Sequence, residues 1–125
     1  MADGLRNTGE RVMSNTTELP SVDAPTAAAD TDALLLDVRE YDEWMAGHAP
    51  NALHIAMSGL PDRLGELARD RRIICVCRSG NRSARVTAWL RQQGFDAANM
   101  VGGMTAWASH GLPFVNQAGN PGVVI

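Results

Sequence analysis

Short apolar runs, separated by segments of helical spacing, dominate most of the chain. Residues 34–38 and 73–76 are apolar runs of the kind that forms strands buried on both faces of a parallel sheet. Shorter apolar segments at 52–56 and 97–101 predict two further strands. Because strands and helical segments alternate, the pattern predicts an α/β fold in three layers, with a central and mostly parallel sheet of about five strands.

The segments between the strands have the spacing and the end signals of helices. Residues 83–93 place apolar side chains on one face and are followed by Gly94, a common helix stop. Residues 60–70 have the same spacing, and Pro61 suits a first helical turn. Shorter helices are predicted within 20–32, at 40–46 and at 104–109.

The two ends of the chain lack this pattern. Residues 1–18 are polar without a sustained apolar period, and they are predicted to be a flexible leader. The domain is therefore expected to span 19–115, followed by a tail at 116–125. A length of 125 residues leaves room for one domain of ordinary size.

Composition narrows the function classes. The chain is 45% hydrophobic and 20% charged, as in soluble globular proteins, and no apolar run approaches the roughly 18 residues that would cross a bilayer. The start of the chain lacks the layout of a secretory signal, and two cysteines are too few for a disulfide framework. We therefore expect a cytoplasmic protein without a membrane partner. We also expect a monomer or a weak homodimer.

Charge is distributed unevenly, although the net charge is only −3. Of the 14 acidic residues, 13 lie at or before Asp70, whereas no acid accompanies the six arginines between Arg71 and Phe95. Such a local excess of positive charge attracts a small anion or an acidic partner. Arg78 and Arg82 stand out because they lie in a loop next to a cysteine. A nucleic-acid partner is not expected, because the protein is acidic overall and only 5% aromatic.

Cys77 is the strongest candidate for chemistry. It follows the predicted strand at 73–76, and the loop after it, 78–82, has no large apolar side chain and leads into a helix. Ligands of open parallel sheets bind at the carboxyl ends of the strands, and Gly80 allows this loop to wrap so that successive backbone N–H groups converge. Those N–H groups, the positive end of the helix and the nearby arginines would all favour a thiolate. Cys77 is therefore a candidate nucleophile.

The loop around Cys77 has the sequence Cys77-Arg78-Ser79-Gly80-Asn81-Arg82-Ser83. This sequence resembles the active-site loop of the rhodanese (thiosulfate sulfurtransferase) family. Three other pieces resemble the family in order and spacing, namely 36–40 with Tyr41 and Trp44, the turn at 47–52, and 102–107 with Gly111-Leu112-Pro113. The departures are Ala49 and Asn51 in place of the usual Ile and Gly, and Met57 where proline is common. The resemblance covers about 19–115 and implies a rhodanese-like α/β/α domain.

The resemblance also implies a sulfurtransferase that needs no cofactor and no metal. Cys77 would attack the outer sulfur of a small anionic donor such as thiosulfate and carry that sulfur as a persulfide. The acceptor would be cyanide in an assay, and a thiol, free or on a protein, in the cell. Backbone N–H groups of residues 78–83 would hold the negative charge of the terminal sulfur.

Charged residues near the loop are assigned supporting roles. Arg78 would steer the anionic donor towards the loop. Arg82 would brace the loop against a carboxylate such as Asp37 or Glu40. Asp37 and Arg39 are expected to form an ion pair that supports the loop rather than to act in catalysis.

Several alternatives stay open at this stage. A cysteine phosphatase is disfavoured because its loop places five residues between cysteine and arginine, whereas four separate Cys77 from Arg82. A non-catalytic interaction or sensing module commonly lacks the cysteine, and a dedicated persulfide relay would differ only in its donor and acceptor. Cys75 is expected to be a buried structural residue rather than a resolving thiol, because a disulfide to Cys77 would be strained. His48 and His54 do not have the spacing of a metal site with Cys75.

Overall fold

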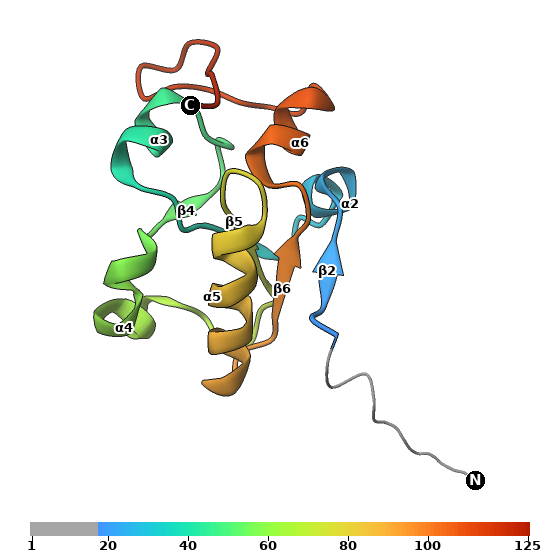
Figure 1. The fold of residues 1–125 in the computed structure, drawn as a ribbon, viewed down its shortest axis with the longest axis vertical. Coiled ribbons are helices and arrows are strands. Elements are labelled where there is room, and N and C mark those ends of the chain that lie inside the picture. Colours follow the sequence, from blue (N-terminus) through green and yellow to red (C-terminus); the bar gives the residue numbers. More distant parts are fainter. Residues whose placement is uncertain (1–17) are drawn as a thin grey trace, which may run out of the picture.

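Five parallel strands form the central layer of the structure (Figure 1). The computed structural model describes residues 18–125, so the predicted leader at 1–18 lies outside the described residues except for its last position. The strands follow the order β2 (Ser21–Val22), β6 (Ala97–Met100), β5 (Ile73–Val76), β3 (Leu34–Asp37) and β4 (Leu53–His54). Every neighbouring pair is parallel. The predicted α/β fold with a parallel sheet of about five strands is confirmed.

The middle of the sheet is apolar on both faces because helices cover both of them. β5 is buried along its whole length, and its neighbours β3 and β6 are buried almost throughout. β3 pairs with β5 from Leu34↔Ile73 to Asp37↔Val76, so the carboxyl ends of these two strands lie side by side. Cys77 leaves β5 at that edge of the sheet.

Helices cover both faces of the sheet and the edge at its carboxyl ends. They are α4 (Leu60–Arg63) and α5 (Asn81–Gln92) on one face, and α2 (Ala24–Ala29) and α6 (Gly103–Ser109) on the other. α3 (Tyr41–Ala46) lies beside the loop between β5 and α5 (Figure 1). Two 3-10 turns, η2 (Met57–Gly59) and η3 (Leu64–Glu66), flank α4. Among the helices of residues 18–125, none is long and apolar enough to span a bilayer.

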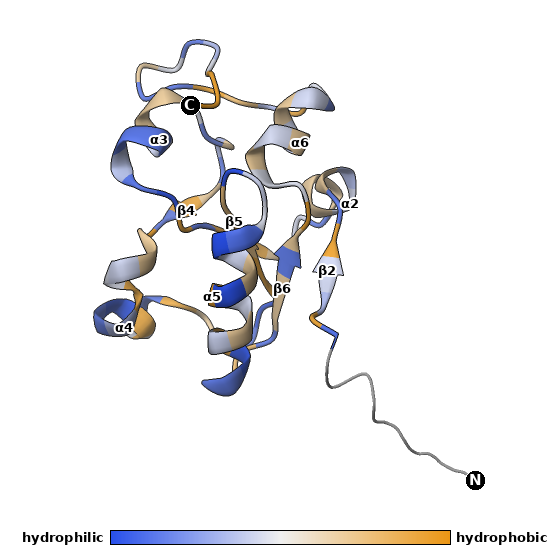
Figure 2. Ribbon diagram, viewed as in Figure 1, coloured by the Kyte–Doolittle hydropathy of each residue, from blue (hydrophilic) through white to orange (hydrophobic). Residues whose placement is uncertain are grey.

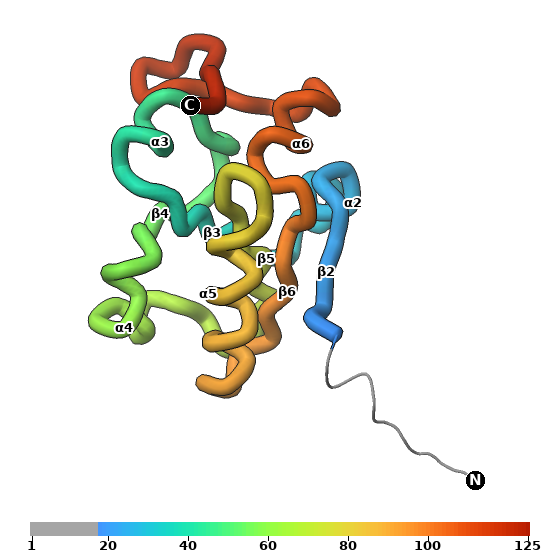
Figure 3. Tube along the Cα trace, viewed as in Figure 1, coloured from blue at the N-terminus to red at the C-terminus, as the bar shows by residue number. Residues whose placement is uncertain are grey.

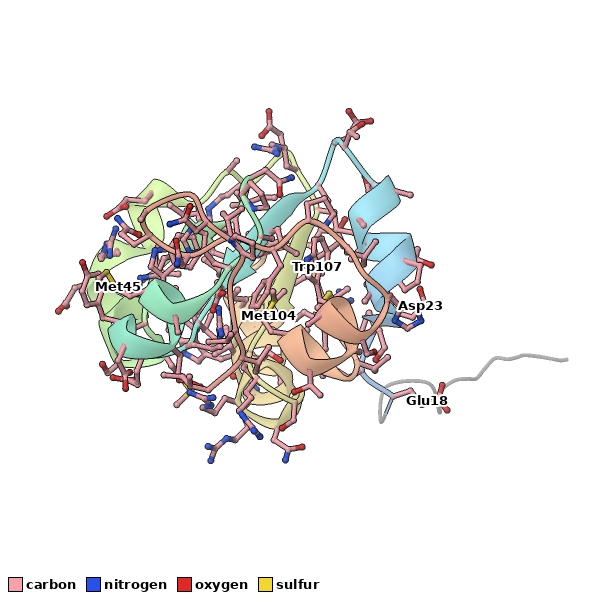
Figure 4. All side chains as sticks on the ribbon, turned by 90° about the horizontal axis from the view of Figure 1, so that it is seen from above. Glu18, Asp23, Met45, Met104 and Trp107 are labelled. Carbon is pink, nitrogen blue, oxygen red and sulfur yellow. The ribbon has the colours of Figure 1, made fainter. Side chains whose placement is uncertain are left out.

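Two apolar clusters fill the space between the layers. The cluster beneath α5 contains Leu36 and Cys75, and the cluster beneath α6 contains Met104 and Trp107. Figure 4 shows these last two side chains between α6 and the sheet. Figure 2 shows apolar colour along the central strands and polar colour where α5 begins, next to the loop after β5. That loop therefore stands on a sheet that is packed from both sides.

Several elements differ from their predicted bounds. The sequence pattern does not predict β2, a two-residue edge strand that pairs with β6. The predicted helix at 60–70 ends at Arg63, whose φ of −122° and ψ of 15° leave the helical region, and continues only as the short η3. β4 covers two of the five residues predicted at 52–56. α5 begins at Asn81, earlier than predicted, because Gly80 turns the chain with a φ of 109°.

The C-terminal residues, predicted as a tail, pack against α3 (Figure 3). The N–H groups of Gln117 and Val123 donate to the carbonyls of Met45 and Ala46 at 3.1 and 2.9 Å. These carbonyls belong to the last turn of α3, where helical partners are lacking. Gly47 allows the close approach, because a Cβ there would lie 2.8 Å from the carbonyl oxygen of Val123. The segment therefore closes the carbonyl end of α3.

Candidate active site

Cys77 lies between the end of the central strand β5 and the start of α5. The backbone at this point is fixed from α6, because the N–H groups of Met104 and Thr105 donate to the carbonyls of Cys77 and Arg78 at 2.8 and 3.0 Å. Gly103 has a φ of 56°, and a Cβ there would overlap the carbonyl oxygen of Cys77. Only glycine fits such a position. The glycine turn at the start of α6 therefore supports the cysteine loop.

Hydrogen-bond donors surround the sulfur of Cys77. The backbone N–H groups of Gly80 and Ser83 point at Sγ from 3.1 and 3.4 Å, and the Ser83 hydroxyl oxygen lies 3.3 Å away. Ser79 and Asn81 are exposed, whereas Cys77 is only 1% exposed. The sulfur thus lies at the floor of the loop, with several donors directed at it.

The pKa of Cys77 is set by a balance between burial and hydrogen bonds. Burial disfavours the thiolate, but hydrogen bonds from the Ser83 hydroxyl and from the amides of Ser83, Gly80 and Ser79 together outweigh it and hold the pKa of Cys77 below its ordinary value. The N-terminal end of α5 acts in the same direction, because it carries partial positive charge. Since the thiolate is the reactive form of cysteine, this environment favours a nucleophile.

Cys75, two residues earlier and inside β5, has a different environment. It has no exposed surface, and burial raises its pKa to about 12. Both cysteines are free thiols. A thiol with so high a pKa stays protonated near neutral pH, which agrees with a structural role for Cys75.

Arg82 forms an ion pair with Glu43 of α3. Two hydrogen bonds of 2.8 and 2.9 Å join the guanidinium to the carboxylate, and they lower the pKa of Glu43 and raise that of Arg82. The prediction that Arg82 pairs with Asp37 or Glu40 is wrong. Asp37 is hydrogen-bonded to Arg39. Glu40 is the N-cap of α3, and its backbone N–H donates to the Glu43 carboxylate at 3.0 Å. The ion pair joins the start of α5 to α3.

Asp37, the last residue of β3, forms a buried ion pair with Arg39, two residues further on. Nη2 of Arg39 lies 2.7 Å from Oδ2 of Asp37 and also donates to the carbonyl of Gly47 at 2.7 Å. The predicted ion pair is therefore present, and it fastens the turn after β3 to the chain beyond α3. Its link to the cysteine loop is indirect, through α3 and Glu43.

Arg78 is the exposed cation of the loop. Its Nε donates to the carbonyl of Ile125 at 3.0 Å, so the C-terminal segment reaches the loop as well as α3. Ser79 and Asn81 are exposed beside it. A guanidinium in this position attracts anions towards the loop.

Asn99 of β6 also contacts the loop, and the sequence prediction omits it. It is 6% exposed, its Nδ2 donates to the carbonyl of Gly80 at 3.2 Å, and its Oδ1 accepts the Ser83 hydroxyl at 2.6 Å. A polar residue inside an otherwise apolar strand was the available signal, because a buried amide needs hydrogen-bond partners.

His48 and His54 stack on Trp44 of α3. Their ring centroids lie 3.7 and 4.9 Å from that of the indole, and their ring nitrogens hydrogen-bond to the backbone carbonyls of Trp44 and Arg39. Within residues 18–125, no group of three or more His, Cys, Asp or Glu side chains is arranged to hold a metal ion. Through their stacking on Trp44 and their hydrogen bonds to backbone carbonyls, the two histidines brace α3, which carries Glu43.

Known proteins resemble this chain over most of its length. Residues 21–110 match the family described as rhodanese-like domain. A sulfurtransferase of Allochromatium vinosum is 42% identical over 104 residues, which are 82% of this chain and 97% of the relative.

Solved structures share the fold. The rhodanese-related protein of Thermoplasma volcanium has a TM-score of 0.73 and 32% identity, with 77% of this chain and 97% of that chain covered. A rhodanese-like domain protein of Staphylococcus aureus has a TM-score of 0.66 and 33% identity, with 71% and 91% covered. The protein therefore belongs to the rhodanese-like domain family and is homologous to sulfurtransferases.

Proposed function

We propose that this domain transfers sulfane sulfur from thiosulfate, or a similar small anionic donor, to a thiol through a persulfide on Cys77. The observation that carries the proposal is the convergence of the Gly80 and Ser83 amides on Sγ, at 3.1 and 3.4 Å. These donors favour the thiolate, and they would also hold the negative charge of a second sulfur bonded to the first. Homology to a sulfurtransferase supports the same class of reaction.

In the first half-reaction, the Cys77 thiolate attacks the outer sulfur of the donor. A new S–S bond forms while the S–S bond of thiosulfate breaks, and sulfite leaves with the electron pair of the broken bond. The product is a persulfide whose terminal sulfur is negative. Arg78, exposed beside the loop, would attract the anionic donor, and the loop amides would stabilise the terminal sulfur.

In the second half-reaction, an acceptor thiolate, or cyanide in an assay, attacks the terminal sulfur. The S–S bond of the persulfide breaks, and its electron pair returns to Cys77 as the thiolate. The acceptor leaves as a persulfide or as thiocyanate. Sulfur moves as a formally neutral atom, so the two half-reactions need no external oxidant or reductant.

We also propose where the reaction takes place and what can enter the site. Cys77 is 1% exposed, so an acceptor must reach it past the exposed Ser79 and Asn81, which favours a small thiol or one that protrudes from a protein. A cytoplasmic setting fits a lone reactive thiol, because a reducing compartment keeps it available. A monomer or a weak homodimer would suffice, because the proposed catalytic groups come from one chain.

The intact mass of the protein after exposure to thiosulfate tests this proposal. We expect one added sulfur atom, which cyanide removes with release of thiocyanate. Cys77→Ser should add no sulfur, whereas Cys75→Ser, the matched control two residues earlier, should add it as the unchanged protein does. Sulfur that persists in Cys77→Ser, or that maps to Cys75, would contradict the proposal.

The same preparation separates the alternatives. A cysteine phosphatase would hydrolyse an aryl phosphate ester and leave thiosulfate untouched. A non-catalytic module would do neither. A dedicated relay would turn over thiosulfate slowly but would accept sulfur quickly from a protein persulfide.

A further inference from the structure

Asn99 links two parts of the cysteine loop from the neighbouring strand. Its Nδ2 donates to the carbonyl of Gly80 at 3.2 Å, and its Oδ1 accepts the Ser83 hydroxyl at 2.6 Å. The oxygen of that hydroxyl also lies 3.3 Å from Sγ of Cys77. Asn99 and Ser83 are 6% and 0% exposed, so bulk water does not readily replace these contacts.

The Ser83 hydroxyl has one proton and two neighbours that can accept it. A hydroxyl donates a single proton, so it serves Asn99 or Cys77 at any one time but not both. The 2.6 Å distance to Asn99 is that of a short O–H···O hydrogen bond, and a neutral sulfur is the weaker acceptor. A neutral thiol can also donate its own proton to the Ser83 oxygen. In the neutral state, the contacts then form a chain from thiol to hydroxyl to amide.

We propose that Asn99 is a positioning residue for Cys77, because its side-chain carbonyl holds the Ser83 hydroxyl while the sulfur is neutral and releases it when the sulfur becomes charged. A hydrogen bond to a charged acceptor is about twice as strong as one between neutral groups. A thiolate therefore draws the hydroxyl away from Asn99. In the persulfide, whose existence rests on the proposed function, the charge moves to the terminal sulfur and the hydroxyl returns to Asn99.

The second contact of Asn99 holds the loop in place during this exchange. The carbonyl of Gly80 accepts the N–H of Ala84 at 3.1 Å as well as Nδ2 of Asn99. Two donors on one oxygen fix the peptide unit at the start of α5, next to the Gly80 N–H that points at Sγ. The nitrogen end of the Asn99 side chain is thus anchored while its oxygen end gains or loses the hydroxyl.

The charged and titratable side chains around the sulfur of Cys77 keep the same charge near neutral pH. Arg82 of α5 and Glu43 of α3 form an ion pair that keeps both charged, and the pKa of Cys75 of β5 is raised to about 12. Arg78 is a permanent cation. The two histidines near α3 hydrogen-bond to backbone carbonyls of α3 and of the turn before it. A thiol-specific probe near neutral pH therefore reports on Cys77.

A double-mutant cycle on the pKa of Cys77 tests the proposal, with Asn99→Ala, Ser83→Ala and the double variant. The pKa is measured from the pH dependence of alkylation by iodoacetamide and from the ultraviolet absorbance of the thiolate. Loss of Asn99 frees the hydroxyl for the thiolate, so it should lower this pKa more when Ser83 is present, by about half a unit to one unit. Any effect of Asn99 on the loop alone should appear equally in both backgrounds. Equal shifts, or a larger drop without Ser83, would overturn the proposal.

A second measurement needs no variant and so covers failure to fold. The side-chain carbonyl carbon of Asn99 is followed by NMR while Cys77 is titrated, with the iodoacetamide-treated protein as control. The resonance should move at the pKa of Cys77 and stay constant once the sulfur is alkylated. If the chemical shift of this carbon does not change as Cys77 ionises, the proposed role of Asn99 is wrong.

These measurements use no sulfur donor, so they stand apart from the proposed function. If a persulfide forms but the effects of Asn99→Ala and Ser83→Ala on the pKa of Cys77 simply add, the proposed role of Asn99 is wrong and the sulfur-transfer proposal stands. Coupling between Asn99 and Ser83 without any persulfide would support the role of Asn99 and remove the sulfur-transfer proposal.

Discussion

The strand β5 and the loop that follows it each carry a buried cysteine, and the pKa values of the two thiols are shifted in opposite directions. Cys75 and Cys77 both belong to the cluster beneath α5, and they are 0% and 1% exposed. Burial nevertheless raises the pKa of Cys75 to about 12, whereas the pKa of Cys77 lies below its ordinary value. Loss of contact with solvent therefore does not by itself make a cysteine inert.

The difference lies in the backbone around each sulfur. Inside β5 the backbone N–H groups donate to the neighbouring strands, and burial of Cys75 raises the pKa of its thiol. Beyond β5 the chain enters the first turn of α5, whose N–H groups lack helical partners. Those of Gly80 and Ser83 point at Sγ of Cys77 instead. A strand that ends at a helix N-terminus thus turns a core cysteine into a candidate nucleophile.

The largest expected contrast is in alkylation. Near neutral pH, iodoacetamide should modify Cys77 at least about 1000-fold faster than Cys75, because their thiolate fractions differ by that factor or more. The rate at Cys77 should rise with pH and level off below the range of an ordinary thiol, since its pKa is lowered. Fragment-ion mass spectrometry assigns the label to one cysteine or the other. Unfolded protein is the control, in which Cys75 and Cys77 should react at the same rate. Equal rates in the folded protein would contradict the proposed difference between the two thiols.

Gly103→Ala should disturb the loop of Cys77 rather than the strand of Cys75. The new Cβ would overlap the carbonyl oxygens of Cys77 and Arg78, at a backbone φ of 56° that disfavours alanine. We expect a loss of about 3 kcal/mol in the free energy of unfolding and of about 100-fold in sulfur transfer. Denaturant unfolding and thiosulfate assays measure the two losses.

Gly65→Ala is the matched control for that substitution. A Cβ at Gly65 meets nothing within 4 Å, and the position does not require a positive φ. Its stability and activity should stay close to those of the unchanged protein. A Gly103→Ala variant as active as this control would mean that α6 does not set the position of the loop.

Glu43→Gln should weaken the link between α3 and the start of α5. It removes the charge that pairs with Arg82 over 2.8 Å, so we expect sulfur transfer to fall about fivefold and stability by about 1 kcal/mol. Glu40→Gln is the control, since it removes one charge at the start of the same helix and leaves the pair of Glu43 and Arg82 in place. Equal losses in the two variants, measured by steady-state rates and thermal unfolding, would assign the effect to general charge rather than to the ion pair.

The sequence predicts the parts of this comparison that depend on local pattern. The apolar run at 73–76 indicates a buried strand because both of its faces must be covered. Small polar residues and Gly80 after it indicate a tight loop. The position of Cys77 between them follows from order along the chain alone.

The partners across space were not predictable in the same way. Whether Arg82 meets Glu40 or Glu43 depends on how α3 packs against α5, and both glutamates lie within one helical turn of each other. Asn99 reaches the loop only because β6 lies beside β5. β2 is too short to show any periodicity, and its pairing with β6 defines it as a strand.

The smallest expected effect belongs to Arg78, at the exposed rim of the loop. Arg78→Ala leaves the amides around Cys77 in place, so it should raise the KM for thiosulfate about threefold to fivefold and change kcat little. The reason is the lost attraction of an anion, which salt screens. Raising the ionic strength should therefore narrow the difference in KM between the variant and the unchanged protein.

Arg85→Ala is the control, an exposed arginine further along α5. Because attraction acts on the donor and not on the sulfur, the alkylation rate of Cys77 by neutral iodoacetamide should be nearly the same in all three proteins. A KM effect that persists at high salt, or an equal effect of Arg85→Ala, would count against steering by Arg78.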